Sequence, residues 1–218
     1  MVNSAIIASI PPHVTVVAVT KTLPASSIQE AYWAGIRHFG ENYAREFEEK
    51  YAQLPEEIQK GATFHMIGHV QSRKIKKVVE LFDWVDSVDS MELAQKLDAA
   101  ARALNKKLHI LFEVNLSGET TKYGFQKSDL VLYGNVHFSN LILDGLMTMP
   151  PAVGNPEENR MIFRSLKKLS ETIRSKHPVF GPALSMGTSQ DYQVAIDEGA
   201  TMVRLGTALF GLRLLFEK

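Results

Sequence analysis

Short apolar segments alternate with longer amphipathic ones along the whole chain. The first apolar segment, residues 14–20, is rich in β-branched residues and ends at the turn Leu23-Pro24, which indicates a buried strand. The same signal recurs along the chain. We predict strands over residues 14–20, 38–42, 63–68, 84–88, 108–115, 141–149, 183–187 and 202–205.

Segments with charged faces or helix-forming composition separate these strands. Ser26 and Ser27 are candidate N-caps of the first helix, and Gly35 is the residue type that commonly follows a helix. We predict helices over residues 26–34, 43–54, 91–104, 127–138, 155–174, 190–198 and 207–212, with a further helix around the basic run Arg73 to Lys77.

Eight strands that alternate with helices imply parallel pairing, and eight such strands favour a closed barrel over an open sheet. An open doubly wound sheet usually has a glycine-rich turn after its first strand, whereas the turn from Thr20 to Pro24 contains no glycine. The predicted fold is therefore α/β, a single (β/α)8 TIM-type barrel over residues 1–218, with residues 1–13 as a short N-terminal extension.

The extension is short and the last predicted helix is brief, so the ring of helices is expected to be incomplete. Apolar strand surface left open in this way is a place where a second subunit can pack. A monomer or a weak homodimer is the expected state.

Composition narrows the classes of function. Lys and Arg together number 24, as do Asp and Glu, so the formal net charge is zero and no basic footprint of a nucleic-acid or membrane-surface binder is present. The chain has no cysteine, which excludes disulfides, thiol nucleophiles and cysteine-ligated metals. No apolar stretch has the length of a membrane span. A protein of the reducing cytoplasm is expected.

The first strand brings a lysine to the end of the barrel where active sites are built. Side chains alternate across a strand, so Val17, Val19 and Lys21 share one face. If that face points inward, Lys21 lies at the mouth of the barrel, where desolvation favours a neutral, nucleophilic amine. A strand-end lysine that simply turns into solvent is the alternative.

The last two strands each run into a glycine followed by a hydroxyl residue. These are Gly187-Thr188 and Gly206-Thr207, both expected at helix N-termini, where backbone N–H groups favour an anion. Loops after the seventh and eighth strands are also where such barrels commonly bind phosphate.

An arginine inside the barrel adds a further polar group. Arg204 shares a face with Met202, opposite Val203 and Leu205, and needs an acceptor if it is buried. A ring nitrogen, a phosphate or a buried carboxylate would each serve. A lysine, a phosphate site and an interior arginine suit a pyridoxal 5'-phosphate (PLP) protein, and they also suit a Schiff-base aldolase acting on a sugar phosphate.

A metal site is not expected. His65 and His69 are four residues apart, but on a strand end and its loop, where this spacing does not place them on one face.

Seven segments, in order, carry a resemblance to a known family. The chain resembles the pyridoxal phosphate homeostasis proteins (the YggS/PROSC family), whose barrel is shared with the N-terminal domain of bacterial alanine racemase. The segments are Val17-Ala-Val-Thr-Lys-Thr-Leu-Pro24, Phe39-Gly-Glu-Asn-Tyr43, His65-Met-Ile-Gly68 with Gln71, Lys122-Tyr-Gly124, Gly145-Leu-Met147, Leu184-Ser-Met-Gly187 with Ser189 and Asp191, and Val203-Arg-Leu-Gly-Thr-Ala-Leu-Phe-Gly211.

The resemblance implies a PLP site. It places the Schiff base on Lys21, Arg204 at the pyridine nitrogen, and Asn42 near the cofactor. It assigns the phosphate to Ser189, Gly206 and Thr207, with Met186 and Gly187 lining that end. A cation beside the ring nitrogen disfavours its protonation and weakens the ring as an electron sink, which suits holding the cofactor rather than turning over substrates.

The resemblance therefore implies an intracellular PLP carrier or regulator, with PLP-dependent apoenzymes as its partners. A PLP-dependent amino-acid racemase of weak activity is the alternative. Alanine racemase takes its second acid–base group, a tyrosine, from an additional domain that this chain lacks. Tyr43, Tyr123 and Tyr133 are the residues here that would have to replace it. The N-terminus also departs from the family, whose members carry a helix before the first strand.

Overall fold

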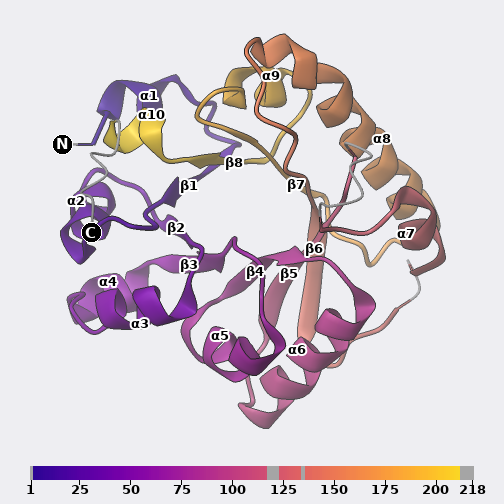
Figure 1. Cartoon of the computed structure of the whole chain (residues 1–218), viewed down its shortest axis with the longest axis horizontal. Coiled ribbons are helices and arrows are strands. Elements are labelled where there is room, and N and C mark those ends of the chain that lie inside the picture. The colour runs from indigo at the N-terminus through magenta and orange to yellow at the C-terminus, as the bar shows by residue number, and fades with distance from the viewer. Residues whose placement is uncertain (1, 117–122, 134–135, 212–218) are drawn as a thin grey trace.

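The computed structural model describes residues 2–116, 123–133 and 136–211, with the backbone alone for residues 131–133. Figure 1 looks along the barrel, with the strands at its centre and helices around them. The strands are β1 (Thr15–Val19), β2 (His38–Glu41), β3 (Thr63–Met66), β4 (Trp84–Val88), β5 (Leu108–Glu113), β6 (Leu141–Met147), β7 (Ala183–Thr188) and β8 (Met202–Leu205).

Helices follow the strands in turn. They are α1 (Ser4–Ser9), α2 (Ala25–Trp33), α3 (Ala44–Tyr51), α4 (Glu56–Gly61), α5 (Ile75–Leu81), α6 (Met91–Ala103), α7 (Lys127–Tyr133), α8 (Arg160–Lys176), α9 (Tyr192–Asp197) and α10 (Thr207–Phe210), with 3-10 turns η1 (Ser72–Lys74) and η2 (Pro156–Asn159).

The eight strands are parallel and form a closed barrel in the order β1 to β8. Closure is made by β1, which pairs with β2 on one side and with β8 on the other. Val17 is thus in register with His38 and with Arg204. The predicted (β/α)8 barrel is confirmed.

Alternation along the strands divides the apolar residues into two cores. Val17, Leu111, Met147 and Met202 form a small cluster inside the barrel. The larger cluster, which includes Ala18 and Val203, fills the layer between strands and helices. The predicted inward face of β1 and the inward face of β8 are both confirmed by this division.

A row of four rings lies near the amino-terminal ends of β2 to β5. His38 and His65 have ring centroids 5.2 Å apart, His65 stacks on Trp84 at 5.1 Å, and Trp84 stacks on His109 at 4.8 Å. We call this row the ring floor of the barrel. Trp84 of this row packs against the interior cluster.

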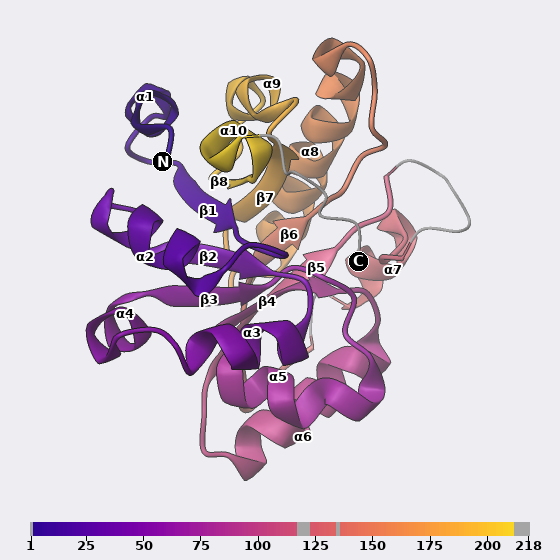
Figure 2. The ribbon, with the colours of Figure 1, turned by 60° about the vertical axis from the view of Figure 1, so that its left-hand side comes forward.

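The N-terminal extension forms a helix that was not predicted. In Figures 1 and 2, α1 lies beside α10, and the Asn3 N–H donates to the Leu209 carbonyl at 2.9 Å. Ile6 and Ile7 of α1 pack against the outer core. The chain therefore covers this part of the barrel with its own residues, although α1 has only six.

Several element boundaries differ from prediction. The predicted helix 43–54 ends at Tyr51, and a second short helix, α4, follows Pro55. The first helix starts at Ala25, so Ser26 and Ser27 lie in its first turn and are not its caps. Gly35 does follow that helix with a φ of +100°. The predicted helix 127–138 extends too far: α7 is described to Tyr133, residues 134–135 fall outside the described residues, and 136–138 are not helical. The predicted end at Leu212 also falls outside the described residues.

In the described part of the chain, no helix combines the length and apolar character that crossing a bilayer requires.

Candidate functional site

A cavity of about 530 Å³ opens at the carboxyl ends of the strands, within the roughly 300–1,000 Å³ of small-molecule sites. Residues from β1, β2, β3, β6, β7 and β8 or the loops after them line it. They are Val19, Lys21, Asn42, Ile67, Met149, Thr188, Ser189, Gln190, Arg204, Gly206 and Thr207. Six of the eight predicted site residues are in this set.

Lys21 lies in the turn after β1 and is half-buried. Val19, two residues earlier, lines the same cavity, and Val17 lies inside the barrel below it. The predicted alternation of this strand therefore extends to the lysine. Thr22, which follows it, has a φ of +61°, a conformation that β-branched residues rarely adopt. The turn at Lys21 is strained and must be held by its surroundings.

The support comes from a buried ion-pair cluster behind the turn. Lys50 Nζ on α3 contacts Glu41 Oε1 at 2.9 Å and Glu46 Oε1 at 2.6 Å. Thr20 Oγ1 donates to Glu41 Oε1 at 2.8 Å. Burial raises the pKa of Glu41, and Lys50 opposes that shift. Sequence reasoning missed this cluster, although alternation along β2 places Glu41 on the side facing the helices.

Arg204 is 4% exposed, and its guanidinium points into the barrel. Nη1 donates to Ser185 Oγ at 2.6 Å, while Nη2 donates to the Thr148 carbonyl at 2.9 Å and lies 3.0 Å from Met149 Sδ. Burial lowers the pKa of Arg204, and nearby carboxylates raise it. All three hydrogen-bond partners are neutral.

Main-chain N–H groups converge on Ser189 at the β8 side of the cavity. The N–H groups of Gly206 and Ala208 each donate to Ser189 Oγ at 3.1 Å. This places one hydroxyl and two donors at the start of α10, where the sequence predicted an anion site.

The β7 turn differs from the prediction. Gly187 and Thr188 belong to β7, and α9 begins only at Tyr192, so they are not at a helix N-terminus. The Thr188 N–H donates instead to Asp191 Oδ1 at 2.7 Å, and Asn159 Nδ2 donates to Asp191 Oδ2 at 2.8 Å. A carboxylate fixes this turn, and Ser189 and Gln190 inside it line the cavity.

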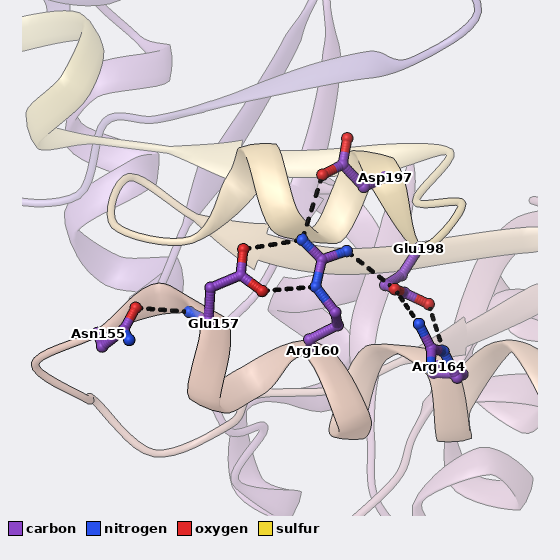
Figure 3. A network of polar contacts seen from close by, with 6 residues as sticks. All are labelled: Asn155, Glu157, Arg160, Arg164, Asp197 and Glu198. Carbon is purple, nitrogen blue, oxygen red and sulfur yellow. Dashed lines mark hydrogen bonds and ion pairs between the residues drawn. The ribbon is translucent and has the colours of Figure 1, made fainter.

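An ion-pair network fixes α9 behind that turn (Figure 3). Arg160 on α8 contacts Glu157 Oε2 at 2.6 Å, Glu198 Oε1 at 2.9 Å and Asp197 Oδ2 at 3.4 Å. Arg164 contacts Glu198 Oε1 at 2.8 Å. These arginines hold the pKa of Glu198 down, at about 2. The network joins the C-terminal end of α9 to the first turns of α8.

Met186 and Gly187 are placed differently from the other predicted site residues. The Met186 side chain is fully buried in the outer core, so only its main chain faces the barrel side. Gly187 has a φ of +90°, and a Cβ there would lie 2.5 Å from the Cβ of Ala195. Its structural role is the close packing of α9 on β7.

Among the described residues, no tyrosine lines the cavity. Tyr43 is 58% exposed, and Tyr123 is 59% exposed and stacks on His69 with ring centroids 4.1 Å apart. His65 lies inside the barrel, whereas His69 bonds Asp89 at its rim, so these two histidines do not form a pair. The side chain of Tyr133, and Lys122 of the resemblance, lie outside the described residues.

The family of the chain follows from comparison with known proteins. The sequence model of the alanine racemase N-terminal domain matches residues 3–214. A pyridoxal phosphate homeostasis protein from Synechocystis sp. is 41% identical over 215 residues, covering 98% of each chain. The chain belongs to the pyridoxal phosphate homeostasis family.

Other members of the pyridoxal phosphate homeostasis family span nearly the same length. The Escherichia coli protein of that name is 36% identical over 205 residues, 93% of this chain and 87% of that one. The structure of PipY from Synechococcus elongatus with PLP bound has a TM-score of 0.86 and 35% identity, covering 95% of this chain and 97% of PipY.

A Clostridium difficile alanine racemase shares the barrel alone. It has a TM-score of 0.73 and 14% identity, and the match covers 95% of this chain but 55% of the racemase.

Proposed function

We propose that this protein holds PLP as a Schiff base on Lys21 and takes part in intracellular PLP homeostasis. The observation that carries the proposal is one cavity lined by Lys21, Arg204 and the turn at Gly206 and Thr207. The similar PipY of Synechococcus elongatus, solved with PLP bound, supports it.

The described residues fit such a group. Lys21 belongs to the cavity lining, and Arg204 is a buried cation whose hydrogen-bond acceptors are all neutral. The N–H groups of Gly206 and Ala208, with the Ser189 hydroxyl, form a compact polar group of the kind that receives phosphate. Asn42 lines the same cavity from the end of β2.

Bound PLP supplies an aldehyde that captures primary amines and a ring that withdraws electrons. In this proposal Arg204 lies at the ring nitrogen and, as a cation, disfavours its protonation. Ser189, Gly206 and Thr207 hold the phosphate, and Met186 and Gly187 contribute through the main chain alone. Lys21 forms and releases the covalent bond. These roles favour a carrier over an enzyme.

A location in the cytoplasm and exchange with PLP-dependent apoenzymes belong to the same proposal. The absence of cysteine suits a reducing compartment. No residue of the cavity offers the opposing tyrosine that the weak-racemase alternative needs, so that alternative has no specific support among the described residues.

An absorbance spectrum before and after borohydride, followed by peptide mapping, tests the proposal. We expect a yellow protein whose reduced adduct maps to Lys21. Lys21→Ala should abolish the adduct while circular dichroism shows an intact barrel. Lys60→Ala, at an exposed lysine on α4, is the matched control and should keep the adduct. A protein that stays colourless with added PLP, or an adduct retained in Lys21→Ala, contradicts the proposal.

A further inference from the structure

A second hollow, of about 360 Å³, lies beside the cavity that Lys21 lines. We call it the Glu113 hollow. Its lining includes Glu113, Asn115, Tyr123, Met149, Pro150 and Pro151. Met149 lines the Lys21 cavity as well, so it is a wall common to both. The hollow is built at the ends of β5 and β6, and β5 is four strands from β1 in either direction around the closed barrel. It therefore lies across the barrel mouth from Lys21.

Main-chain hydrogen bonds hold the β5 side of the hollow in place. The Phe125 N–H donates to the Glu113 carbonyl at 2.8 Å, and the Asn115 N–H donates to the Phe125 carbonyl at 3.1 Å. On the other side, the Val114 N–H donates to the Met147 carbonyl of β6 at 2.8 Å. The segment that carries Glu113 is thus fixed between two neighbouring segments.

Glu113 brings a carboxylate to this hollow. Leu111, two residues earlier, belongs to the interior cluster, so alternation places Glu113 on the same inward face. Its side chain is half-buried, and no hydrogen bond or ion pair joins its carboxylate to another residue in the part of the chain that the structure describes. Burial raises the pKa of Glu113 and Asp89 adds to that rise, while Arg204 and His69 oppose it. A cationic ligand would compensate this carboxylate for the hydration that it loses.

An aromatic ring and two prolines form the other walls. The Tyr123 ring stacks on His69 with centroids 4.1 Å apart, and His69 Nδ1 lies 3.1 Å from Asp89 Oδ2. One face of the ring is therefore covered by a supported neighbour. Aromatic rings attract ammonium groups, and apolar surface such as that of Pro150 and Pro151 accommodates the methylene groups of a lysine stem.

These features select one class of ligand, a primary ammonium on an apolar stem. A free amino acid carries a carboxylate next to its ammonium group, and that carboxylate would be repelled by Glu113 and Asp89. Arg204 is the opposing cation nearby. Its guanidinium donates to Ser185 Oγ and the Thr148 carbonyl, and it lines the Lys21 cavity rather than this hollow.

We propose that the Glu113 hollow receives a lysine side chain of a partner protein, whose ammonium group pairs with Glu113 and whose stem lies against Tyr123. A lysine on a protein is favoured over a free amine because Met149 and Tyr123 are 48% and 59% exposed, which offers apolar surface to the residues that flank the lysine. The partner class rests on the proposed function, since PLP-dependent apoenzymes hold their cofactor on a lysine. The pairing with Glu113 needs no cofactor.

An NMR titration of the cofactor-free protein tests this pairing. The probe is Nα-acetyl-lysine N-methylamide, which has no charge apart from its side-chain ammonium. We expect saturable shifts in the N–H signals of Glu113, Asn115, Met149 and Ala152. Nα-acetyl-norleucine N-methylamide, which lacks the ammonium group, should bind at least about tenfold more weakly. Equal affinity for the two probes, or shifts confined to other parts of the chain, overturns the proposal.

Two variants locate the binding groups. Glu113→Gln should weaken binding of the lysine probe about tenfold, and Tyr123→Leu about threefold. Glu57→Gln, at an exposed carboxylate on α4, is the matched control and should keep the wild-type affinity. Wild-type affinity in Glu113→Gln refutes the pairing. If Glu113→Gln does not fold, Tyr123→Leu decides, and an undiminished affinity there refutes the hollow as the site.

A small amine tests the source of the ligand. Butylamine has the ammonium group and the stem but no flanking peptide groups, so we expect it to bind more weakly than the lysine probe. Equal affinity would show that the flanking groups contribute nothing, and it would overturn the choice of a protein lysine.

The borohydride-reduced protein separates this inference from the proposed function. With PLP fixed on Lys21, the lysine probe should still bind, because the two linings share only Met149. Loss of binding would place the probe in the Lys21 cavity and overturn the hollow. If the wild-type protein takes up no PLP, the proposed function fails, and the cofactor-free titration still decides whether Glu113 binds an ammonium group. If PLP is fixed on Lys21 but no probe binds to either form, the function stands and the hollow fails.

Discussion

Lys50 Nζ lies 2.8 Å from the carbonyl oxygen of Thr20, the residue immediately before Lys21. The same ammonium contacts both carboxylate oxygens of Glu41, at 2.9 and 3.0 Å. Glu46, its other partner, accepts the N–H of Thr22 on the far side of Lys21. The main chain is thus tied on both sides of the proposed Schiff-base lysine by charges from β2 and α3.

Breaking this cluster should destabilise the protein and disturb Lys21. Lys50→Met leaves Glu41 buried without its cation, which we expect to cost about 3–5 kcal/mol of unfolding free energy, as for other buried pairs. Denaturant unfolding measures the loss, and borohydride trapping should show less adduct at Lys21. The double variant Lys50→Met with Glu41→Gln should lose less than the single one. A single-variant loss below about 1 kcal/mol, the level of an exposed pair, would refute this role.

The carboxylate that ties the β7 turn should affect cofactor affinity. The Asp191 carboxylate accepts from three donors: the Thr188 N–H and hydroxyl at Oδ1, and Asn159 Nδ2 at Oδ2. Asp191→Asn keeps only one acceptor oxygen, so at least one bond is lost or weakened. A lost charge-assisted bond of about 1.5 kcal/mol corresponds to roughly a tenfold weaker Kd for PLP. Titration of the cofactor-free protein with PLP measures it. Asp197→Asn, at the far end of α9, is the control, and equal Kd values in both variants would contradict the prediction.

Gly187 should not tolerate a side chain. At a φ of +90° and with Ala195 Cβ 2.5 Å from an added Cβ, Gly187→Ala combines backbone strain with a clash between β7 and α9. We expect a loss of at least about 2 kcal/mol and a lower melting temperature. Gly154→Ala, where nothing lies within 4 Å of the added Cβ, is the matched control. Similar melting temperatures for the two variants would count against this packing role.

The ion-pair network between α8 and α9 should make the free energy of unfolding depend on pH in the acidic range. Because the arginines lower the folded pKa of Glu198 to about 2, its contribution is present above the unfolded value of about 4.3 and is lost as pH falls between the two. Glu198→Gln should flatten the fall in melting temperature between those pH values. Glu171→Gln is the control. Glu171 is exposed on α8, and its change should leave the dependence of melting temperature on pH unchanged. A wild-type slope retained in Glu198→Gln would exclude this residue as its source.

Alternation and strand count predicted much of the fold and two of the cavity residues, Lys21 and Arg204. The turn after the last strand indicated Gly206 and Thr207, whereas Asn42 and Ser189 came only from the family resemblance. The inward positions of Val17 and Arg204 follow from period two alone, because one face of each strand reads as apolar against the helices. The same rule applied to β7 places Ser185 inward and Met186 outward. The structure has that arrangement, which is why the Met186 side chain is absent from the cavity lining.

The buried polar groups could not be predicted in this way. His38, His65 and Asp86 occupy inward positions on three strands, although aspartate is mostly exposed in proteins and histidine is only intermediate in burial. Their burial depends on mutual hydrogen bonds between strands that are distant in sequence. The burial of Lys50 could not be predicted either, because its ion-pair partner Glu41 is brought close only when α3 packs against β2. The extra helix α4 was missed because a turn of six residues carries little periodic signal.

The ring floor makes the two ends of the described barrel chemically different. His38, His65, Trp84 and His109 occupy the end of β2 to β5 opposite the cavity with rings, and neighbouring ring centroids are 4.8 to 5.2 Å apart. The groups that can bind a ligand are therefore gathered at one rim of the barrel. If a ligand both enters and leaves over Lys21, the site can be refilled only after the previous ligand has gone, so release would limit the rate of exchange.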